Sequence, residues 1–209
     1  MIDKNKIVKL IENHQAGIFG NPRKASVMLL LIEIEGEWHI IFEVRGNSIS
    51  QPGETSFPGG GIEIGETKEE AAIRETVEEL GVKPDNIEII GEIDFTASEN
   101  HVVYCFVGIL NNTELADLKP DKHEVDDVFT VPLNYFLTNQ PEYFDIPIKV
   151  DPEADFPFHL IKGGIKYPFY AFDRKVPFYC LPKEVAEYTL WGFTAGFVDN
   201  FINIIKNKN

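Results

Sequence analysis

The stretch FPGGGIEIGETKEEAAIRETVEELGV, residues Phe57–Val82, carries seven glutamates around a single arginine and includes a run of three glycines. From Thr67 to Leu80 it has the pattern of one helix, because Thr67 and Glu70 form a capping box and Gly81 suits the position that ends a helix. Like charges at neighbouring helical positions destabilise a helix. The segment therefore needs either solvent or a cation to offset the repulsion.

Three of these acids share one face of the expected helix. Glu75, Glu78 and Glu79 stand at positions i, i+3 and i+4, which are neighbours on a helix surface. Carboxylates that converge on one point suit a hard divalent cation such as Mg²⁺ or Mn²⁺. The alternative is a solvated face, which is the ordinary place for glutamate.

The opposite face of the helix is apolar and predicts contact with a core. It carries Ile73, Val77 and Leu80. Ala71 and Ala72 flank the acidic face, and we expect their small side chains to leave room for a ligand. The pattern thus predicts a helix that is anchored on one side and open on the other.

The spacing of the conspicuous residues decides between the two alternatives. They follow Gly-x5-Glu-x7-Arg-Glu-U-x-Glu-Glu-x-Gly-U, where U is apolar, and they are Gly60, Glu66, Arg74, Glu75, Glu78, Glu79 and Gly81. This is the Nudix box, and the segment resembles a Nudix hydrolase, with Thr76 where the family usually has an aliphatic residue. The resemblance implies an α/β (α+β) fold, a three-layer α/β/α sandwich around a mixed sheet. It also implies metal-dependent hydrolysis of a diphosphate in a nucleoside diphosphate derivative.

The resemblance assigns metal ligands and their support. The expected ligands are Glu75, Glu78, Glu79 and a carbonyl near Gly60. Arg74 is expected to orient a glutamate, with Glu75 as its partner, and Glu66 to support the loop or the metal shell.

The catalytic set that follows is Glu75, Glu78, Arg74 and Glu66. The general base stays open between Glu75 and a later loop acid, for which Glu99 and Glu124 are the candidates.

The residues before the box indicate a substrate class. IIFEVRGNSISQPGETSFPGG, residues 40–60, resembles the element that precedes the box in coenzyme A pyrophosphatases, and LWGFTAGFVDNF, residues 190–201, resembles the element that opens their last helix. The resemblance implies a site with Arg45, Gln51, Ser56, Phe57 and Gly59. The extra 3′-phosphate of coenzyme A calls for extra positive charge, and the candidates for it are Arg23, Lys24 and Arg45.

The whole chain, residues 1–209, is predicted to form one Nudix domain with an N-terminal helix and a C-terminal helical extension. We expect the N-terminal helix over 2–12 and a hairpin of two strands over 25–46. Further strands are expected over 86–97 and 101–110, followed by a strand and a short helix over 121–137. The pattern of residues 139–182 predicts another hairpin together with irregular segments that cover the core. The pattern of residues 183–206 predicts one long helix.

Composition limits the possible partners. The 209 residues carry a net charge of −15 and no basic tract, which argues against nucleic acid or an anionic membrane as a partner. There is no signal-peptide pattern and no apolar run long enough for a bilayer. The two cysteines form no disulfide framework, which favours a reducing, cytoplasmic setting. The supply of aromatic residues makes a homodimer plausible.

Three hypotheses remain open on the sequence. The leading one is a Mg²⁺- or Mn²⁺-dependent diphosphatase that cleaves coenzyme A or acyl-coenzyme A to 3′,5′-ADP and the (acyl-)4′-phosphopantetheine. The second is a Nudix diphosphatase for NADH or ADP-ribose. The third is a Nudix-fold module that binds a nucleotide without catalysis, which the presence of Glu75, Glu78 and Glu79 disfavours.

Overall fold

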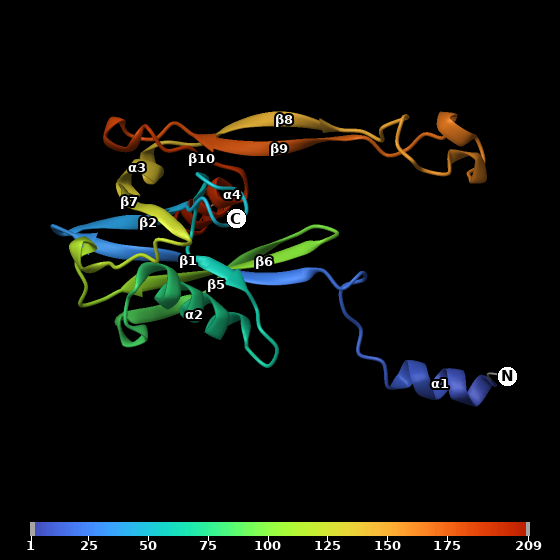
Figure 1. The fold of residues 1–209 in the computed structure, drawn as a ribbon, viewed down its shortest axis with the longest axis horizontal. Helices are drawn as coiled ribbons and strands as arrows, with labels where there is room; N and C mark the ends of the chain where they lie inside the picture. The colour runs from blue at the N-terminus through green and yellow to red at the C-terminus, as the bar shows by residue number, and fades with distance from the viewer. Residues whose placement is uncertain (1–2, 208–209) are drawn as a thin grey trace.

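The computed structural model describes residues 3–207 and is built around one mixed β-sheet (Figure 1). Five strands follow the order β3-β2-β1-β6-β5, while β4 pairs with β1 and β7 pairs with β2. The strands are β1 (Arg23–Ile34), β2 (Glu37–Arg45), β3 (Thr55–Ser56), β4 (Gly59–Gly61), β5 (Ile87–Ala97), β6 (His101–Leu110) and β7 (Val125–Pro132). The sheet is mixed because β1 is parallel to β6 and antiparallel to β2.

The first hairpin forms where the sequence predicts it. Ile34 pairs with Glu37, and the two residues between them, Glu35 and Gly36, have φ angles of 51° and 83°. Two successive residues with positive φ are what a two-residue type I′ turn requires. The turn sets the register that carries the rest of β2 alongside β1.

Helices cover both faces of the sheet, which confirms the three-layer α+β arrangement (Figure 1). α2 (Lys68–Leu80) packs on one face, over an apolar cluster that includes Ile41 of β2. α3 (Leu133–Thr138) and α4 (Gly192–Ile205) cover the other face, where the cluster includes Phe42. The neighbours Ile41 and Phe42 belong to different clusters because successive strand residues point to opposite faces.

The apolar anchoring of α2 differs from the sequence prediction. Ala71 and Ala72 are fully buried, so they do not leave room for a ligand; they let the helix lie close to the sheet. Leu80 is fully buried as expected, whereas Ile73 and Val77 lie at the rim of the cluster.

A second, three-stranded sheet extends from the main body (Figure 1). It consists of β8 (Glu142–Ile148), β9 (Phe172–Tyr179) and β10 (Leu190–Trp191), with β9 in the middle. The hairpin expected within residues 139–182 is therefore present. We call β8, β9 and the segment 149–171 that joins them the arm.

The last helix begins later than predicted. Instead of one helix over 183–206, the chain forms a 3₁₀ turn at Lys183–Val185, then β10, then α4. Trp191 pairs with Phe178 of β9, and Gly192 has a φ of +66°, so the backbone is held out of helical geometry until that point. The other 3₁₀ turns are Pro84–Asn86, Leu115–Asp117, Phe158–Leu160 and Gly164–Lys166.

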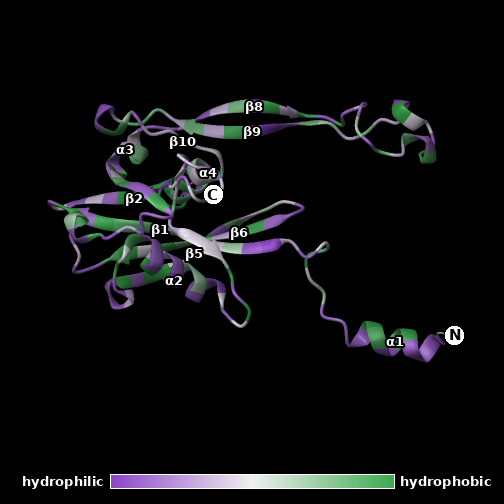
Figure 2. Ribbon diagram, in the orientation of Figure 1, coloured by the Kyte–Doolittle hydropathy of each residue, from purple (hydrophilic) through white to green (hydrophobic). Residues whose placement is uncertain are grey.

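The N-terminal helix α1 (Lys4–Glu12) confirms most of the predicted helix, while Ile2 lies outside the described residues. The helix has no buried residue, and it projects from the body with one apolar and one polar face (Figure 2). Within residues 3–207, no helix combines the length and the apolar composition needed to cross a bilayer.

Candidate metal centre and substrate cavity

The acidic helix α2 is fixed at both ends. The Thr67 side chain accepts a hydrogen bond from the Glu70 backbone, and the Glu70 carboxylate accepts one from Thr67 N–H, which completes the capping box. Gly81 ends the helix in the left-handed region, with a φ of +66°. The predicted capping box and C-terminal glycine are both confirmed. These two ends fix the position of each glutamate relative to β4, which packs against the helix.

The glycines of β4 allow the strand to lie very close to its neighbours. A Cβ on Gly59 would stand 2.4 Å from the carbonyl oxygen of Ser26, and one on Gly60 would stand 2.4 Å from a carboxylate oxygen of Glu75. Gly59 N–H donates to Glu79 Oε2 at 2.7 Å. Gly59 therefore positions a glutamate through its backbone, and its missing side chain is what permits the approach.

Two carboxylates are buried together at the centre of the site. Glu43 on β2 is 0% exposed and Glu79 is 3% exposed. Ser56 Oγ donates to Glu43 Oε1 at 2.8 Å, whereas Glu43 Oε2 is buried without a hydrogen-bond partner. Burial raises the pKa of both carboxyl groups, and for Glu79 the negative charge of Glu43 raises the pKa further. Such a pair needs a proton or a cation to offset its charge.

The sequence interpretation missed Glu43. The available signal was a single charged residue inside the apolar strand HIIFEV, at a position that alternation places on the face covered by α2. An acid at a fully buried strand position needs a partner, and that partner comes from the box helix.

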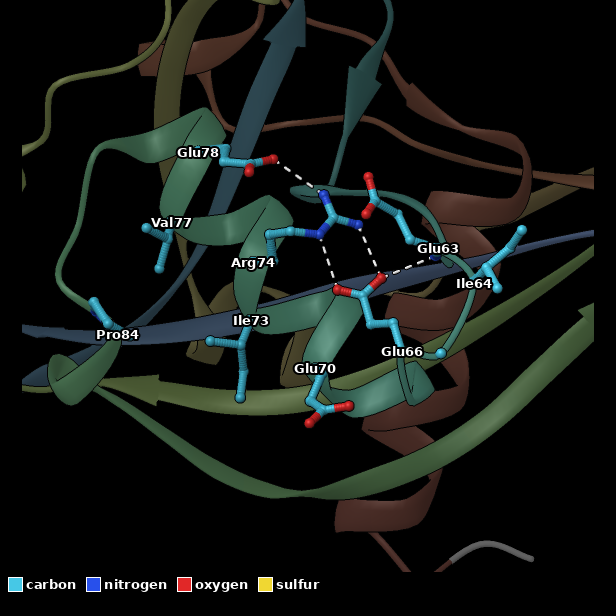
Figure 3. A pocket seen from close by; sticks show the side chains of 10 residues that line it. Glu63, Ile64, Glu66, Glu70, Ile73, Arg74, Val77, Glu78 and Pro84 are labelled. Atoms are coloured by element: carbon cyan, nitrogen blue, oxygen red, sulfur yellow. Dashed lines mark hydrogen bonds and ion pairs between the residues drawn. The ribbon is translucent and has the colours of Figure 1, made fainter.

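Arg74 holds the exposed side of the acidic face together (Figure 3). Its guanidinium donates to both oxygens of Glu66, at 2.9 and 3.1 Å, and to Glu78 at 3.0 Å. It also donates to Glu75 Oε1 at 2.8 Å, so the expected contact with Glu75 is present. The two-point contact with Glu66 is the bidentate one, and this hydrogen bonding lowers the pKa of Glu66. Glu66 thus ties Arg74 to the loop before the helix.

A shallow depression of roughly 600 Å³ lies beside this network and is drawn in Figure 3. Its lining includes Glu63, Glu66, Glu70 and Glu78 but neither Glu75 nor Glu79. A depression lined by so many acids and one arginine is unsuited to an anion.

The predicted substrate residues do not all come together. Arg45, Gln51 and Ser56 line one cavity, whereas Arg23 lines a separate depression that also includes Glu99. Phe57 is wrong as a substrate contact, because its ring is 2% exposed and stacks on Phe42 in the core.

The comparison with known proteins settles the family. The NUDIX domain family model matches residues 22–148, which is more than half of the chain. The chain belongs to the Nudix family. The Nudix box is the acidic segment described above.

The curated Nudix relatives include coenzyme A diphosphatases. A peroxisomal coenzyme A diphosphatase of Mus musculus is 35% identical over 126 residues, which cover 59% of this chain and 52% of that protein. A mitochondrial coenzyme A diphosphatase of Homo sapiens is 27% identical over 137 residues, covering 63% of this chain and 58% of that protein. The chain thus spans about half the length of the curated relatives it matches.

Among solved structures, a MutT/nudix family protein from Enterococcus faecalis covers 98% of this chain and 70% of its own, with a TM-score of 0.51 and 12% identity. This likeness concerns the Nudix fold alone.

Nudix hydrolases generally use divalent metal ions. The carboxylate oxygens of this site are chemically suitable ligands for such an ion. Carboxylate oxygens are hard ligands, and the unpartnered Glu43 Oε2 lies in the same buried cluster as Glu79. Within residues 3–207, however, no three His, Cys, Asp or Glu side chains are already grouped as a ligand set. Glu75 and Glu78 are instead turned to the Arg74 guanidinium. Binding a cation therefore requires these two carboxylates to change partners.

The two loop acids considered as general base lie in different surroundings. The negative charge of Glu124 raises the pKa of Glu43, Glu75 and Glu79, which places it within electrostatic reach of the Nudix acids. Glu99 instead lines the separate depression beside Arg23. Of the two loop acids, Glu124 is the better placed.

Proposed function

We propose that this chain hydrolyses the diphosphate bond of coenzyme A or acyl-coenzyme A with Mg²⁺ or Mn²⁺, releasing 3′,5′-ADP and the (acyl-)4′-phosphopantetheine. The observation that carries the proposal is the buried pair of Glu79 from the box and Glu43, with Glu75 near enough for its charge to raise the pKa of Glu79. A folded protein keeps two carboxylates buried side by side at a cost, and that cost is offset when a cation binds them.

The residues divide the work according to their surroundings. A bound divalent cation would neutralise the diphosphate and lower the pKa of a water molecule. Glu75, Glu78 and Glu79 would hold it, with Glu43 and a carbonyl near Gly60 as further oxygen ligands. Arg74 holds Glu75 and Glu78 beside the site by charge-assisted hydrogen bonds, and both carboxylates would exchange this partner for the cation. Either Glu75 or Glu124 accepts the proton of the attacking water.

The names of the curated relatives support coenzyme A as substrate, since proteins called coenzyme A diphosphatase match at 35% and 27% identity. The test is product analysis after incubation with coenzyme A, dephospho-coenzyme A, NADH and ADP-ribose in the presence of Mg²⁺. We expect coenzyme A to be consumed fastest. Equal or faster consumption of NADH or ADP-ribose would contradict coenzyme A as the substrate. Binding of these compounds without formation of any product would indicate a module that only binds nucleotides.

The buried acids predict how stability depends on pH and on the metal. The ordinary pKa of both Glu43 and Glu79 is 4.5, and the folded protein raises it. Their contribution to stability is therefore fully present below pH 4.5 and is lost as the pH rises through the folded-state pKa values. In chelator at pH 8, we expect Glu79→Gln to melt at least about 3 °C higher than the native protein. Saturating Mg²⁺ should raise the native Tm by about 5 °C and the variant's by much less.

Differential scanning calorimetry between pH 5 and pH 9 measures this. A lower Tm for Glu79→Gln at pH 8, or an equal response of both proteins to Mg²⁺, would contradict the proposed burial of charge at the metal centre.

We also propose that residues 1–209 work as one Nudix unit and that two copies associate through the arm. β8 is the edge strand of its sheet, and all seven of its residues are exposed. An exposed edge is a template for pairing with an identical strand, which gives a two-fold symmetric contact. Sedimentation of the full chain should give twice 23.7 kDa, and Ile148→Lys in β8 should give 23.7 kDa. If the native chain still sediments as a monomer at a protein concentration of about 100 µM, the proposed dimer is wrong.

The compartment stays a prediction. Cys105 is buried and Cys180 is exposed, and neither forms a disulfide. Free thiols of this kind are typical of proteins in a reducing compartment.

A further inference from the structure

A second cavity lies where the arm meets the main body. Its volume is roughly 270 Å³, and it is enclosed by the end of β2, the edge strand β3, β9 of the arm and the start of α4. The residues that matter here are Arg45, Thr55, Arg174, Trp191, Phe193 and Thr194. Arg174 belongs to the region to which the sequence assigned no role.

The cavity gathers positive charge in a strongly acidic protein. Arg45 lies at the end of β2 and Arg174 lies on β9, and neither takes part in a salt bridge within residues 3–207. Arg45 Nε donates to the Ser50 carbonyl at 2.8 Å, which fixes the direction of its guanidinium. The only carboxylate of the lining is Glu54. In a chain with a net charge of −15, two arginines without an ion pair at one cavity leave positive charge for a ligand.

Two nearly buried threonines line the same cavity. Thr55 is 5% exposed and Thr194 is 3% exposed. Neither side chain makes a hydrogen bond within residues 3–207, and neither hydroxyl is among the fully enclosed unpaired groups of that range, so both are accessible from the cavity. Both hydroxyls can donate to an oxygen atom placed between them and the arginines.

The start of α4 adds to this arrangement. The helix has 14 residues, and its N-cap, Trp191, makes no side-chain hydrogen bond to the first turn. Gly192, Phe193 and Thr194 of the first turn line the cavity, so the positive end of the helix dipole lies at the cavity. Helix N-termini of this kind bind phosphate oxygens.

We propose that this cavity binds a phosphate monoester of the substrate, separate from the diphosphate that is cleaved, and that Arg174 determines the preference for it. The volume suits one phosphate group and part of a sugar rather than a whole nucleotide. Ser56 lines the cavity and donates to Glu43, so the cavity adjoins the carboxylates of the proposed metal centre. For the proposed coenzyme A substrate the monoester is the 3′-phosphate, and this assignment rests on the proposed function.

The kinetic test compares coenzyme A with dephospho-coenzyme A, which lacks the monoester. We expect the native protein to prefer coenzyme A, and Arg174→Gln to lower the ratio of the two kcat/KM values by about 10-fold or more, mainly through KM. Arg174→Lys should retain part of the preference, because lysine keeps the positive charge but lacks the planar guanidinium that can donate two parallel hydrogen bonds to a phosphate. The matched control is Lys175→Gln, which removes a cation from the next residue of β9, one that does not line this cavity and pairs with Asp145. An unchanged ratio in Arg174→Gln would overturn the proposal.

A binding test separates this proposal from the proposed function. Calorimetric titration should show that 3′,5′-ADP binds the native protein about 10-fold more tightly than 5′-AMP, and that Arg174→Gln loses this difference. If neither coenzyme A nor dephospho-coenzyme A is hydrolysed but the difference in binding is present, the proposed phosphate site is supported and the proposed reaction is wrong. If coenzyme A is hydrolysed but 3′,5′-ADP binds no better than 5′-AMP, the reaction stands and the cavity proposal is wrong.

Discussion

Glu79→Gln is expected to lower kcat by a factor on the order of 10² or more while the protein stays folded. Glutamine has the shape of glutamate, so its carbonyl can still accept the hydrogen bond from Gly59 N–H. Its amide can donate toward Glu43, whose Oε2 is now without a partner. The substitution therefore removes one negative charge from the proposed ligand set without removing packing. The measurement is kcat with saturating Mg²⁺, together with the melting temperature.

The matched control is Glu69→Gln on the same helix. Glu69 lies in the first turn, is exposed, and makes no hydrogen bond through its side chain within residues 3–207. It should keep native kcat, because a charge on the outer side of the helix does not contribute to the cluster. Native turnover in Glu79→Gln would show that the reaction does not depend on that carboxylate, and the proposed metal centre would be wrong.

Gly59→Ala is expected to destabilise the fold by about 3 kcal/mol or more. The new Cβ would stand 2.4 Å from the Ser26 carbonyl oxygen and 2.6 Å from Val27 Cα, and these are backbone atoms of β1 that cannot turn aside. Gly59 also has a φ of +155°, which strains a residue with a side chain. We expect the melting temperature to fall by about 6 °C or more, and Mg²⁺ to protect the variant less.

Gly61→Ala is the control in the same strand. No heavy atom lies within 4 Å of a Cβ built at Gly61, so this variant should stay within about 0.5 kcal/mol of the native protein. Equal stability of both alanine variants would mean that β4 does not pack against β1 as closely as described.

The sequence predicted the local part of the site well. The helix over 67–80, its capping box and its final glycine depend on residues a few positions apart, and the first hairpin depends on a two-residue turn. Local rules of this kind act through the backbone of the segment itself, so one sequence is enough to apply them.

What the sequence could not predict depends on contacts between distant segments. Glu43 meets Glu79, and Arg174 meets Arg45 at the second cavity, only after the sheet and the arm are in place. Phe57 and Ala71 were misread for the same reason, because a residue next to a motif faces either a ligand or the core according to what packs on it. The late start of α4 depends on β10, which exists only because β9 lies beside it.

The parallel pairing of β1 with β6 has a consequence for the order of folding. The two strands are far apart along the chain, and both β4 and α2 lie between them. Joining them closes a long loop, and that step is slow because the chain entropy is lost before the new contacts form. The carboxylates of the box reach their final spacing only once this loop is closed, so cations would act on the finished fold and would not guide the early collapse of the chain.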